Sequence, residues 1–381
     1  MRRLKGEGTI FRRKDGRWCG AYYDTSNQPK RHFVYGTSRR EVQAKLEQKR
    51  TQDALGEKKD FLLQDWVLEY LQNYKKNEIK ETTYSTYLFF WRRNLQGTQL
   101  GQILLSKLNT RDLQAYYNQM QAQGYSSKTL HHLKVLLGSA LKQAVREHFI
   151  GENPNEYTIL PRKKAYTPNI PSKEEILELV QKAKADPLYP IIITTAFTGM
   201  RKGEVMGLRW ENVDFEERTI HVRQSMCRVL EGPDENGKYH SAYKLLEPKT
   251  RKSIRDIPMA EAVYEALQLQ QKYQETEKNE YKDIYIDRGL VFAAYDGGFI
   301  SQRGFMDEYH LFLKRYGVTN CRFHDLRHFF ASLMLDSGAS MKVISELLGH
   351  SQISISMDLY THVYDSVKKR AVDNLNKIIP V

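Results

Sequence analysis

The segment CRFHDLRHFFASLMLDSG (321–338) opens with two histidines and an arginine and continues as an apolar run. At about 3.6 residues per helical turn, His324, Arg327 and His328 share one face. These side chains bind phosphate readily, and the first turn of a helix favours an anion through its N–H groups and dipole. The pattern therefore predicts a helix that buries its later residues and uses its first turn as one wall of a phosphate site.

Three other segments of the second half carry residues of the same chemical kind. TGMRKGEVMGLRW (198–210) places Arg201 after a Thr-Gly break, at the first turn of a new helix, and EPKTRKSIRDIP (247–258) places Lys249 near a turn that leads into a strand. LLGHSQISISMDLYTHV (347–363) places His350 after a glycine that ends a helix, and Tyr360 ten residues later. Taken singly, each residue has an ordinary explanation: a surface charge, a helix end or core packing.

Together these residue types suit attack on a phosphodiester. Arginine forks grip the non-bridging oxygens, which gain charge in the transition state. A tyrosine with a pKa of ~10 needs a base or nearby positive charge to act as nucleophile. A lysine or histidine can protonate the departing sugar oxygen.

Rival phosphoryl-transfer chemistries lack their usual signals. The chain has no GxxxxGK[ST] loop for a nucleotide and no dense Asp/Glu cluster for a two-metal nuclease, although distant carboxylates could converge in space. A covalent phosphotyrosine would retain the energy of the broken linkage. We therefore expect no cofactor: neither ATP nor a metal.

Charge is concentrated at the start of the chain. Of the net charge of +13, residues 1–59 carry +9, with 16 Lys/Arg and 7 Asp/Glu, which leaves +4 for the other 322 residues. This indicates a basic module for a polyanion, or a merely solubilising arm. Three short strands are expected within residues 8–35, followed by a helix with Ser38 as N-cap and Glu41 closing a capping box. A β-ribbon fits the DNA major groove, and the candidate contacts are Arg12, Arg13, Lys14, Arg17, Lys30 and Arg31.

The remaining chain is expected to be mainly helical. Residues 60–155 show apolar and aromatic stripes at helical spacing, more typical of a core than of base-stacking platforms, for example Leu63, Trp66, Val67, Tyr70, Leu71 and Tyr74. A proline-containing stretch at 156–171 indicates a linker. Residues 172–381 then form a mainly helical domain with extended segments at 218–225 and 252–258, and with a long hairpin between them. The predicted fold is a multidomain α+β protein: a three-stranded sheet with one helix, a helical bundle, and a helical domain with a small antiparallel sheet.

Cysteine usage and hydropathy bear on location. The three cysteines, Cys19, Cys227 and Cys321, are odd in number, scattered and without metal-ligand spacing, as expected of free thiols in a reducing cytoplasm. No run reaches the ~18 apolar residues of a membrane span, and the basic start has no signal-peptide core behind it. We expect a cytoplasmic bacterial protein without a membrane partner.

The chain strongly resembles the tyrosine recombinases, or phage integrases. The matching segments are TGMRKGEVMGLRW, PKTRKSIRDIP, HDLRHFFASLMLDSG and LLGHSQISISMDLYTH, and residues 126–154 resemble the last helix of that family's core-site-binding domain. The basic start resembles the arm-site-binding domain of integrases from conjugative transposons and temperate phages. The implied domains are 1–59 for arm sites, 60–155 for the core site, and 172–381 for catalysis with a C-terminal tail.

The resemblance implies a role for each residue. Tyr360 would be the nucleophile that forms a 3′-phosphotyrosine, Arg201 and Arg327 the phosphate clamp, and Lys249 the general acid. His324 would take the tyrosine proton and His350 would support the phosphate. Glu204 is expected to orient Arg201, whereas helix capping and packing are expected for Asp325 and His328.

The implied partners are double-stranded DNA at core and arm attachment sites, further copies of the chain in dimers and tetramers held by the tail, and an accessory excision factor. Two other functions stay open. One is a type IB topoisomerase-like enzyme that relaxes DNA. The other is a DNA-binding regulator without catalysis.

Overall fold

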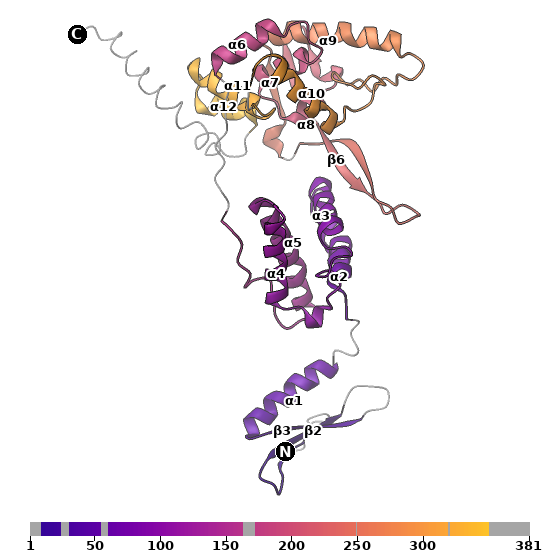
Figure 1. Ribbon diagram of the computed structural model, residues 1–381, viewed down its shortest axis with the longest axis vertical. Coiled ribbons are helices and arrows are strands. Elements are labelled where there is room, and N and C mark those ends of the chain that lie inside the picture. The colour runs from indigo at the N-terminus through magenta and orange to yellow at the C-terminus, as the bar shows by residue number, and fades with distance from the viewer. Residues whose placement is uncertain are drawn as a thin grey trace, which may run out of the picture. The chain divides into compact units, whose positions relative to one another are not determined.

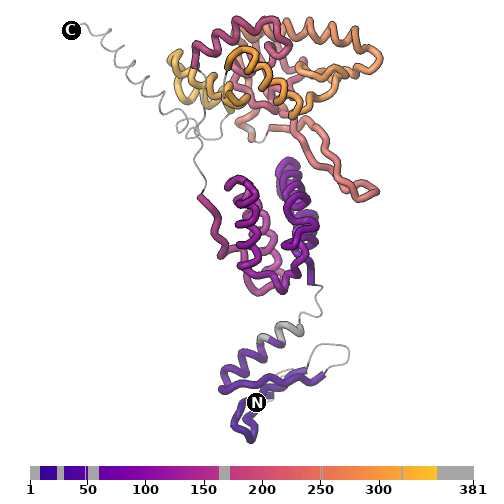
Figure 2. The backbone as a smooth tube through the Cα atoms, in the orientation of Figure 1, coloured from indigo at the N-terminus to yellow at the C-terminus, as the bar shows by residue number. Residues whose placement is uncertain are grey.

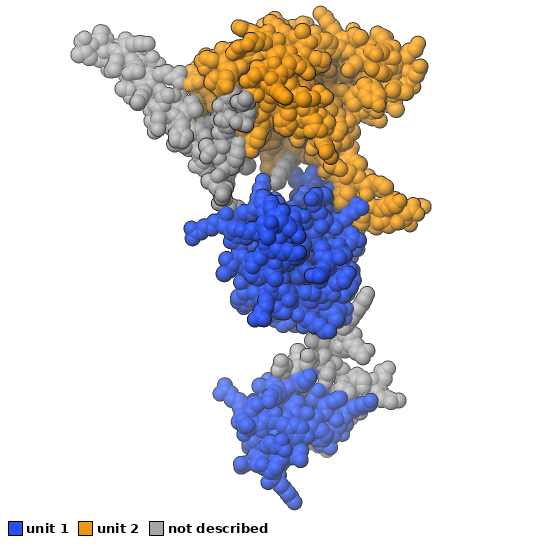
Figure 3. Space-filling view, viewed as in Figure 1, with its two compact units in different colours: residues 1–164 blue, residues 165–381 orange. Residues whose placement is uncertain are grey.

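The computed structural model describes residues 9–23, 30–54, 60–162, 172–248, 250–318 and 321–349. The chain divides into two compact units, residues 1–164 and residues 165–381 (Figure 3). The further division of the first unit at residue 59 stays a prediction.

The N-terminal residues form the predicted three-stranded sheet with one helix (Figure 1). Strands β1 (Thr9–Arg12), β2 (Trp18–Tyr23) and β3 (Arg31–Gly36) pair antiparallel in that order, and α1 (Arg39–Ala54) packs on one face. The close approach requires glycine at position 20, where a Cβ atom would lie 2.5 Å from Leu46 Cδ1.

The predicted N-cap of α1 at Ser38 is confirmed, but the Glu41 carboxylate accepts a different backbone N–H than predicted. The backbone N–H of Glu41 donates to Ser38 Oγ at 3.2 Å, as in a capping box. The Glu41 carboxylate accepts the backbone N–H of Thr37, one residue earlier than the capping box predicts, at 2.8 Å.

Residues 60–162 are helical, as the apolar stripes predict. The helices are α2 (Leu63–Tyr70), the π-helical turn η1 (Leu71–Lys75), α3 (Glu81–Asn94), the 3₁₀ turn η2 (Leu105–Lys107), α4 (Thr110–Ala122) and α5 (Ser127–Arg146). Most of the first stripe is buried, and Trp66 Nε1 donates to the backbone oxygen of Ala140 at 2.8 Å. The prediction is wrong for Tyr74, which is 42% exposed, because the π-helical turn breaks the 3.6-residue period after Tyr70.

The second unit surrounds a fully apolar helix with other helices and two small sheets. Its elements are α6 (Lys173–Lys182), α7 (Tyr189–Thr198), α8 (Lys202–Met206), η3 (Trp210–Asn212), β4 (Val213–Asp214), β5 (Thr219–Val222), β6 (Ser225–Glu231), β7 (His240–Leu246), η4 (Arg251–Ser253), β8 (Arg255–Pro258), α9 (Glu261–Glu280), α10 (Gln302–Arg315), α11 (Asp325–Asp336) and α12 (Met341–Leu348). Strands β4, β5 and β8 form one antiparallel sheet, and β6 pairs with β7. Figure 2 shows that pair as the predicted long hairpin, extending from the body of the unit.

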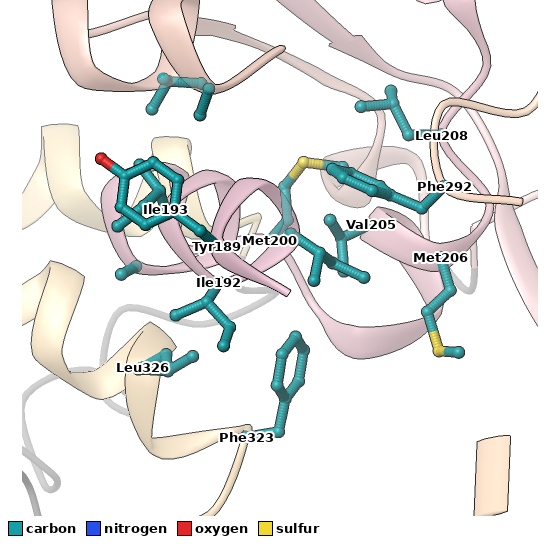
Figure 4. Packing of buried hydrophobic residues seen from close by; sticks show 14 of the residues in the cluster. Tyr189, Ile192, Ile193, Met200, Val205, Met206, Leu208, Phe292, Phe323 and Leu326 are labelled. Atoms are coloured by element: carbon teal, nitrogen blue, oxygen red, sulfur yellow. The ribbon is translucent and has the colours of Figure 1, made fainter. Parts of the chain in front are cut away.

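The core of the second unit lies around α7. This helix is buried on nearly its whole surface and packs against α9 and α11. Figure 4 shows Ile192 of α7 beside Phe323 and Leu326, which lie at the start of α11. The core thereby fixes the end of α7, where Arg201 follows, against the first turn of α11, which carries Arg327.

Among the described residues, no helix is both long and apolar enough to cross a membrane.

Candidate active site

Arg201 lies where α7 ends and α8 begins, as its sequence context predicts. Helix α7 stops at Gly199, whose φ of +65° is left-handed, and Arg201 is the N-cap residue of α8. Its Nη1 atom lies 2.7 Å from Glu204 Oε1, and its backbone N–H donates to Glu204 Oε2 at 2.8 Å. Glu204 thus orients Arg201, and the arginine side chain remains 35% exposed.

Arg327 lies deeper, with 2% of its surface exposed. Its Nη1 donates to the backbone oxygen of Gly199 at 2.7 Å, and its Nη2 donates to that of Leu348 at 2.6 Å. One guanidinium on α11 therefore joins the ends of α7 and α12.

His324 is the N-cap residue of α11, and its ring meets that of His328 edge-on, with 5.1 Å between centroids. The pKa of His324 is lowered to about 4, first by burial of part of the ring and then by the charges of His328, Arg327 and Arg201. Part of the ring also reaches solvent. The imidazole is neutral at pH 7 and can accept a proton.

Asp325 and His328 have the structural roles expected for them. Asp325 is fully buried, and its carboxylate accepts hydrogen bonds from the backbone N–H and from Nη2 of Arg322, both at 3.0 Å. His328 packs in the interior, and its burial is the main cause that lowers its pKa.

Three of the six predicted catalytic residues are described, and they share one site. Arg201 and Arg327 both act electrostatically on His324, although Arg201 is more than 120 positions away in the chain. The other three, Lys249, His350 and Tyr360, lie outside the described residues. Gly349, the residue before His350, accepts a hydrogen bond from Arg201 Nη2 at 2.9 Å.

Sequence reasoning missed Arg255, a buried arginine on β8. Its Nη2 lies 2.9 Å from Glu204 Oε2, on the same carboxylate that holds Arg201. The available signal is the alternation of β8, in which Arg255 and Ile257 are buried while Asp256 and Pro258 are exposed. An arginine in register with a buried isoleucine points to an inward-facing charge that needs a partner.

The six predicted DNA contacts of the N-terminal module are all exposed: Arg12, Arg13, Lys14, Arg17, Lys30 and Arg31. Arg13 and Arg17 lie over the Tyr35 ring at 5.5 and 5.9 Å, and Arg31 lies over the Phe33 ring at 5.2 Å. Tyr35 and Phe33 belong to the face of the sheet opposite α1. This face therefore carries exposed aromatic rings with arginines against them.

Within the described part of the chain, no group of three or more His, Cys, Asp or Glu residues could hold a metal ion.

The phage integrase family model matches residues 172–366, which are 195 of the 381 residues. The chain belongs to the phage integrase family. A tyrosine recombinase XerC-like protein of Caldanaerobacter subterraneus is 31% identical to this integrase over 371 residues, covering 91% of this chain and 92% of that protein. The transposase from transposon Tn916 of Enterococcus faecalis is 24% identical, covering 96% of this chain and 93% of that one.

Solved structures show the same fold. The integrase of transposon Tn1549 in complex with transposon right end DNA aligns with a TM-score of 0.65 at 21% identity, covering 83% of this chain and 99% of that one. A lambda integrase dimer bound to a core site aligns with a TM-score of 0.56 at 18% identity, covering 94% of this chain and 96% of that one. This integrase is thus a site-specific DNA recombinase of the tyrosine class.

Proposed function

We propose that this integrase inserts and excises a mobile genetic element by cutting and rejoining DNA through a 3′-phosphotyrosine on Tyr360. The convergence of Arg201, Arg327 and His324 carries this proposal. It places two permanent positive charges and a neutral imidazole together. Preorganised cations are most effective where the phosphoryl oxygens gain charge.

The proposed roles follow from these environments. Arg201 is partly exposed and held by Glu204, and it binds the non-bridging oxygens of the phosphate. Arg327 is buried, contributes its positive charge to the site and fixes the ends of α7 and α12. His324 takes the proton of Tyr360, since a base must be neutral beforehand. The family resemblance assigns Lys249 to protonation of the leaving 5′-oxygen and His350 to support of the phosphate.

The proposed partners are core and arm attachment sites on double-stranded DNA. Residues 60–155 and 172–381 would bind the core site, and residues 1–59 would bind arm sites through the arginine and aromatic face described above. The Tn1549 and lambda integrases in the matched structures are bound to DNA, and a lambda integrase forms a tetramer on a Holliday junction. We place this integrase on bacterial cytoplasmic DNA, as dimers and tetramers joined by the C-terminal tail, with an accessory factor for excision.

The decisive substitution is Tyr360→Phe. It should leave binding to a nicked core-site DNA unchanged but form no covalent protein–DNA adduct, because the attacking oxygen is gone. The matched control is Tyr364→Phe, which removes a hydroxyl from the same segment and should still form the adduct. Adduct formation by the Tyr360→Phe protein would overturn the assignment of the nucleophile.

One assay separates the three functions considered. Purified protein is mixed with two attachment-site DNAs, and the products are resolved on a gel. Recombinant molecules support the proposal, relaxed topoisomers alone support a topoisomerase, and shifted bands alone support a regulator without catalysis.

A further inference from the structure

Three arginines hold the end of α12. The backbone oxygens of residues 347–349 accept hydrogen bonds in turn from Arg255 at 2.5 Å, Arg327 at 2.6 Å and Arg201 at 2.9 Å. The last carbonyl groups of a helix have no partner within it, and positive charge is favourable at that end. Arg201 and Arg327 belong to the proposed catalytic set. Arg255 does not, although its contacts are at least as extensive.

Arg255 is 8% exposed and uses all three of its side-chain nitrogens. Besides the bond from Nε to the end of α12, Nη1 donates to the backbone oxygen of Ser253 at 3.0 Å, and Nη2 donates to Glu204 Oε2 at 2.9 Å. Each partner belongs to a segment that carries a different proposed catalytic residue. Ser253 closes the turn after Lys249, Glu204 holds Arg201, and α12 leads into His350.

The chain also packs tightly where these segments meet. A Cβ atom at Gly349 would lie 2.9 Å from the backbone oxygen of Lys252 and 3.2 Å from Arg255 Cδ. The end of α12 thus rests directly on the residues that precede β8. Because Arg255 contacts the end of α12, its position helps to fix the position of Gly349.

Glu204 connects Arg255 with Arg201. Its side chain is 3% exposed, and burial alone would raise its pKa, but the hydrogen bond and charge of Arg255, with the charge of Arg201, lower it instead. The carboxylate is therefore ionised between two guanidinium groups. Without Arg255, one of its oxygens would lose a charged donor in the interior.

We propose that Arg255 is a positioning residue for the cleavage reaction: one buried guanidinium aligns the turn after Lys249, the Glu204–Arg201 pair and the end of α12. The inference rests on the proposed function, since it concerns the same site. It assigns Arg255 no contact with DNA. The fork geometry is essential, because a lysine at this position keeps the charge but cannot direct three nitrogens to three fixed acceptors.

The test measures binding and chemistry separately on the full-length protein. Arg255→Lys is compared with wild type for affinity to core-site DNA, for the single-turnover rate of adduct formation on a nicked substrate, and for melting temperature. We expect the dissociation constant to change less than about 2-fold and the adduct rate to fall by about 10- to 100-fold, as misplacement of reacting groups by about 1 Å does.

Arg315→Lys is the matched control. Arg315 of α10 pairs with the buried carboxylate of Asp186 in the same unit. Its side chain is 55% exposed, so Arg315→Lys should lower the melting temperature less than Arg255→Lys does and leave the adduct rate unchanged. The inference fails if Arg255→Lys forms the adduct at the wild-type rate, or if Arg315→Lys slows the reaction as much.

A comparison with Glu204→Gln covers the case in which Arg255→Lys is too unstable to assay. The Arg255→Gln and Glu204→Gln pair removes both buried charges, which often restores stability. Because Arg255 also holds Ser253 and the end of α12, the double variant should form the adduct more slowly than Glu204→Gln alone. A double variant that reacts as fast as Glu204→Gln alone would overturn the proposal. Absence of any adduct with wild-type protein would instead overturn the proposed function, and the inference with it.

Discussion

At the scale of single residues, the site combines ionised groups that hold one another with histidines that stay neutral. Glu204 is kept charged by Arg255 and Arg201, whereas burial lowers the pKa of His324 and His328. Glu204 lies within hydrogen-bonding distance of both arginines, and this outweighs the effect of its burial. For the two histidines burial is the largest cause of the lowered pKa, and the opposite charge of Asp325 does not offset it.

The histidines predict how stability depends on pH. An unfolded histidine titrates near 6.5, whereas the folded chain binds these protons only at lower pH, for His324 at about 4. Below about 6.5 the unfolded state therefore binds more protons, and the free energy of unfolding falls as the pH decreases toward 4. Above 6.5 this contribution does not change.

Replacing His328, which is buried, should make the free energy of unfolding depend less on pH. For His328→Gln, urea unfolding at pH 7.5 and pH 5 should show a smaller loss of stability between the two pH values than wild type shows. Parallel losses in the two proteins would mean that His328 is not a cause of the acid sensitivity.

At the scale of elements, the site depends on the ends of α7 and α12, where backbone oxygens accept hydrogen bonds from Arg201 and Arg327. Gly199 ends α7 in a left-handed conformation, offers its oxygen to Arg327, and leaves no room for a side chain. A Cβ atom there would lie 2.6 Å from Phe330 Cδ1 and 2.7 Å from Leu348 Cδ2.

Gly199→Ala should therefore affect both stability and chemistry. We expect a loss of at least about 1–2 kcal/mol in the free energy of unfolding from the backbone conformation alone, and a slower adduct rate because Arg327 shifts with its acceptor. The control is Gly338→Ala, which has a φ of +89° at the end of α11 but open space around it. It should cost similar backbone energy and leave the adduct rate unchanged; equal rates for the two variants would contradict the role of Gly199.

The N-terminal sheet supports a prediction about arm-site binding. Arg31 lies against Phe33 on the open face of the sheet, whereas Arg40 is exposed on α1, which covers the other face. Arg31→Ala should weaken arm-site binding and reduce the slope of log K against log salt by about 1, as loss of one phosphate contact does. Arg40→Ala should have little effect. If the two variants reverse this order, the DNA lies on the helix side of the sheet.

At the scale of the whole molecule, charge and chemistry are separated along the chain. Residues 1–59 carry +9 of the net +13, and the described catalytic residues all lie in the second compact unit. Deleting residues 1–59 should abolish arm-site binding in a gel-shift assay and leave core-site adduct formation intact. Arm-site affinity that survives the deletion would place the arm-binding surface elsewhere.

The sequence by itself determined the local structure and the types of the catalytic residues. The flanking turns predicted β1, β2 and β3, the long hairpin was predicted between two extended segments, and Gly349 marked the end of α12 because left-handed backbone favours glycine. The residue types at Arg201, His324 and Arg327 pointed to phosphate chemistry before any contact was known. All of these signals are short-range.

Only the tertiary structure decided what those residues touch. Arg327 and its acceptor Gly199 are 128 positions apart, and Arg201 and its acceptor Gly349 are 148 positions apart. Backbone oxygens are the same in every residue, so no sequence pattern marks the ones that will accept. The burial of Arg255 likewise depends on which surfaces pack together, because burial is a property of contacts between distant segments.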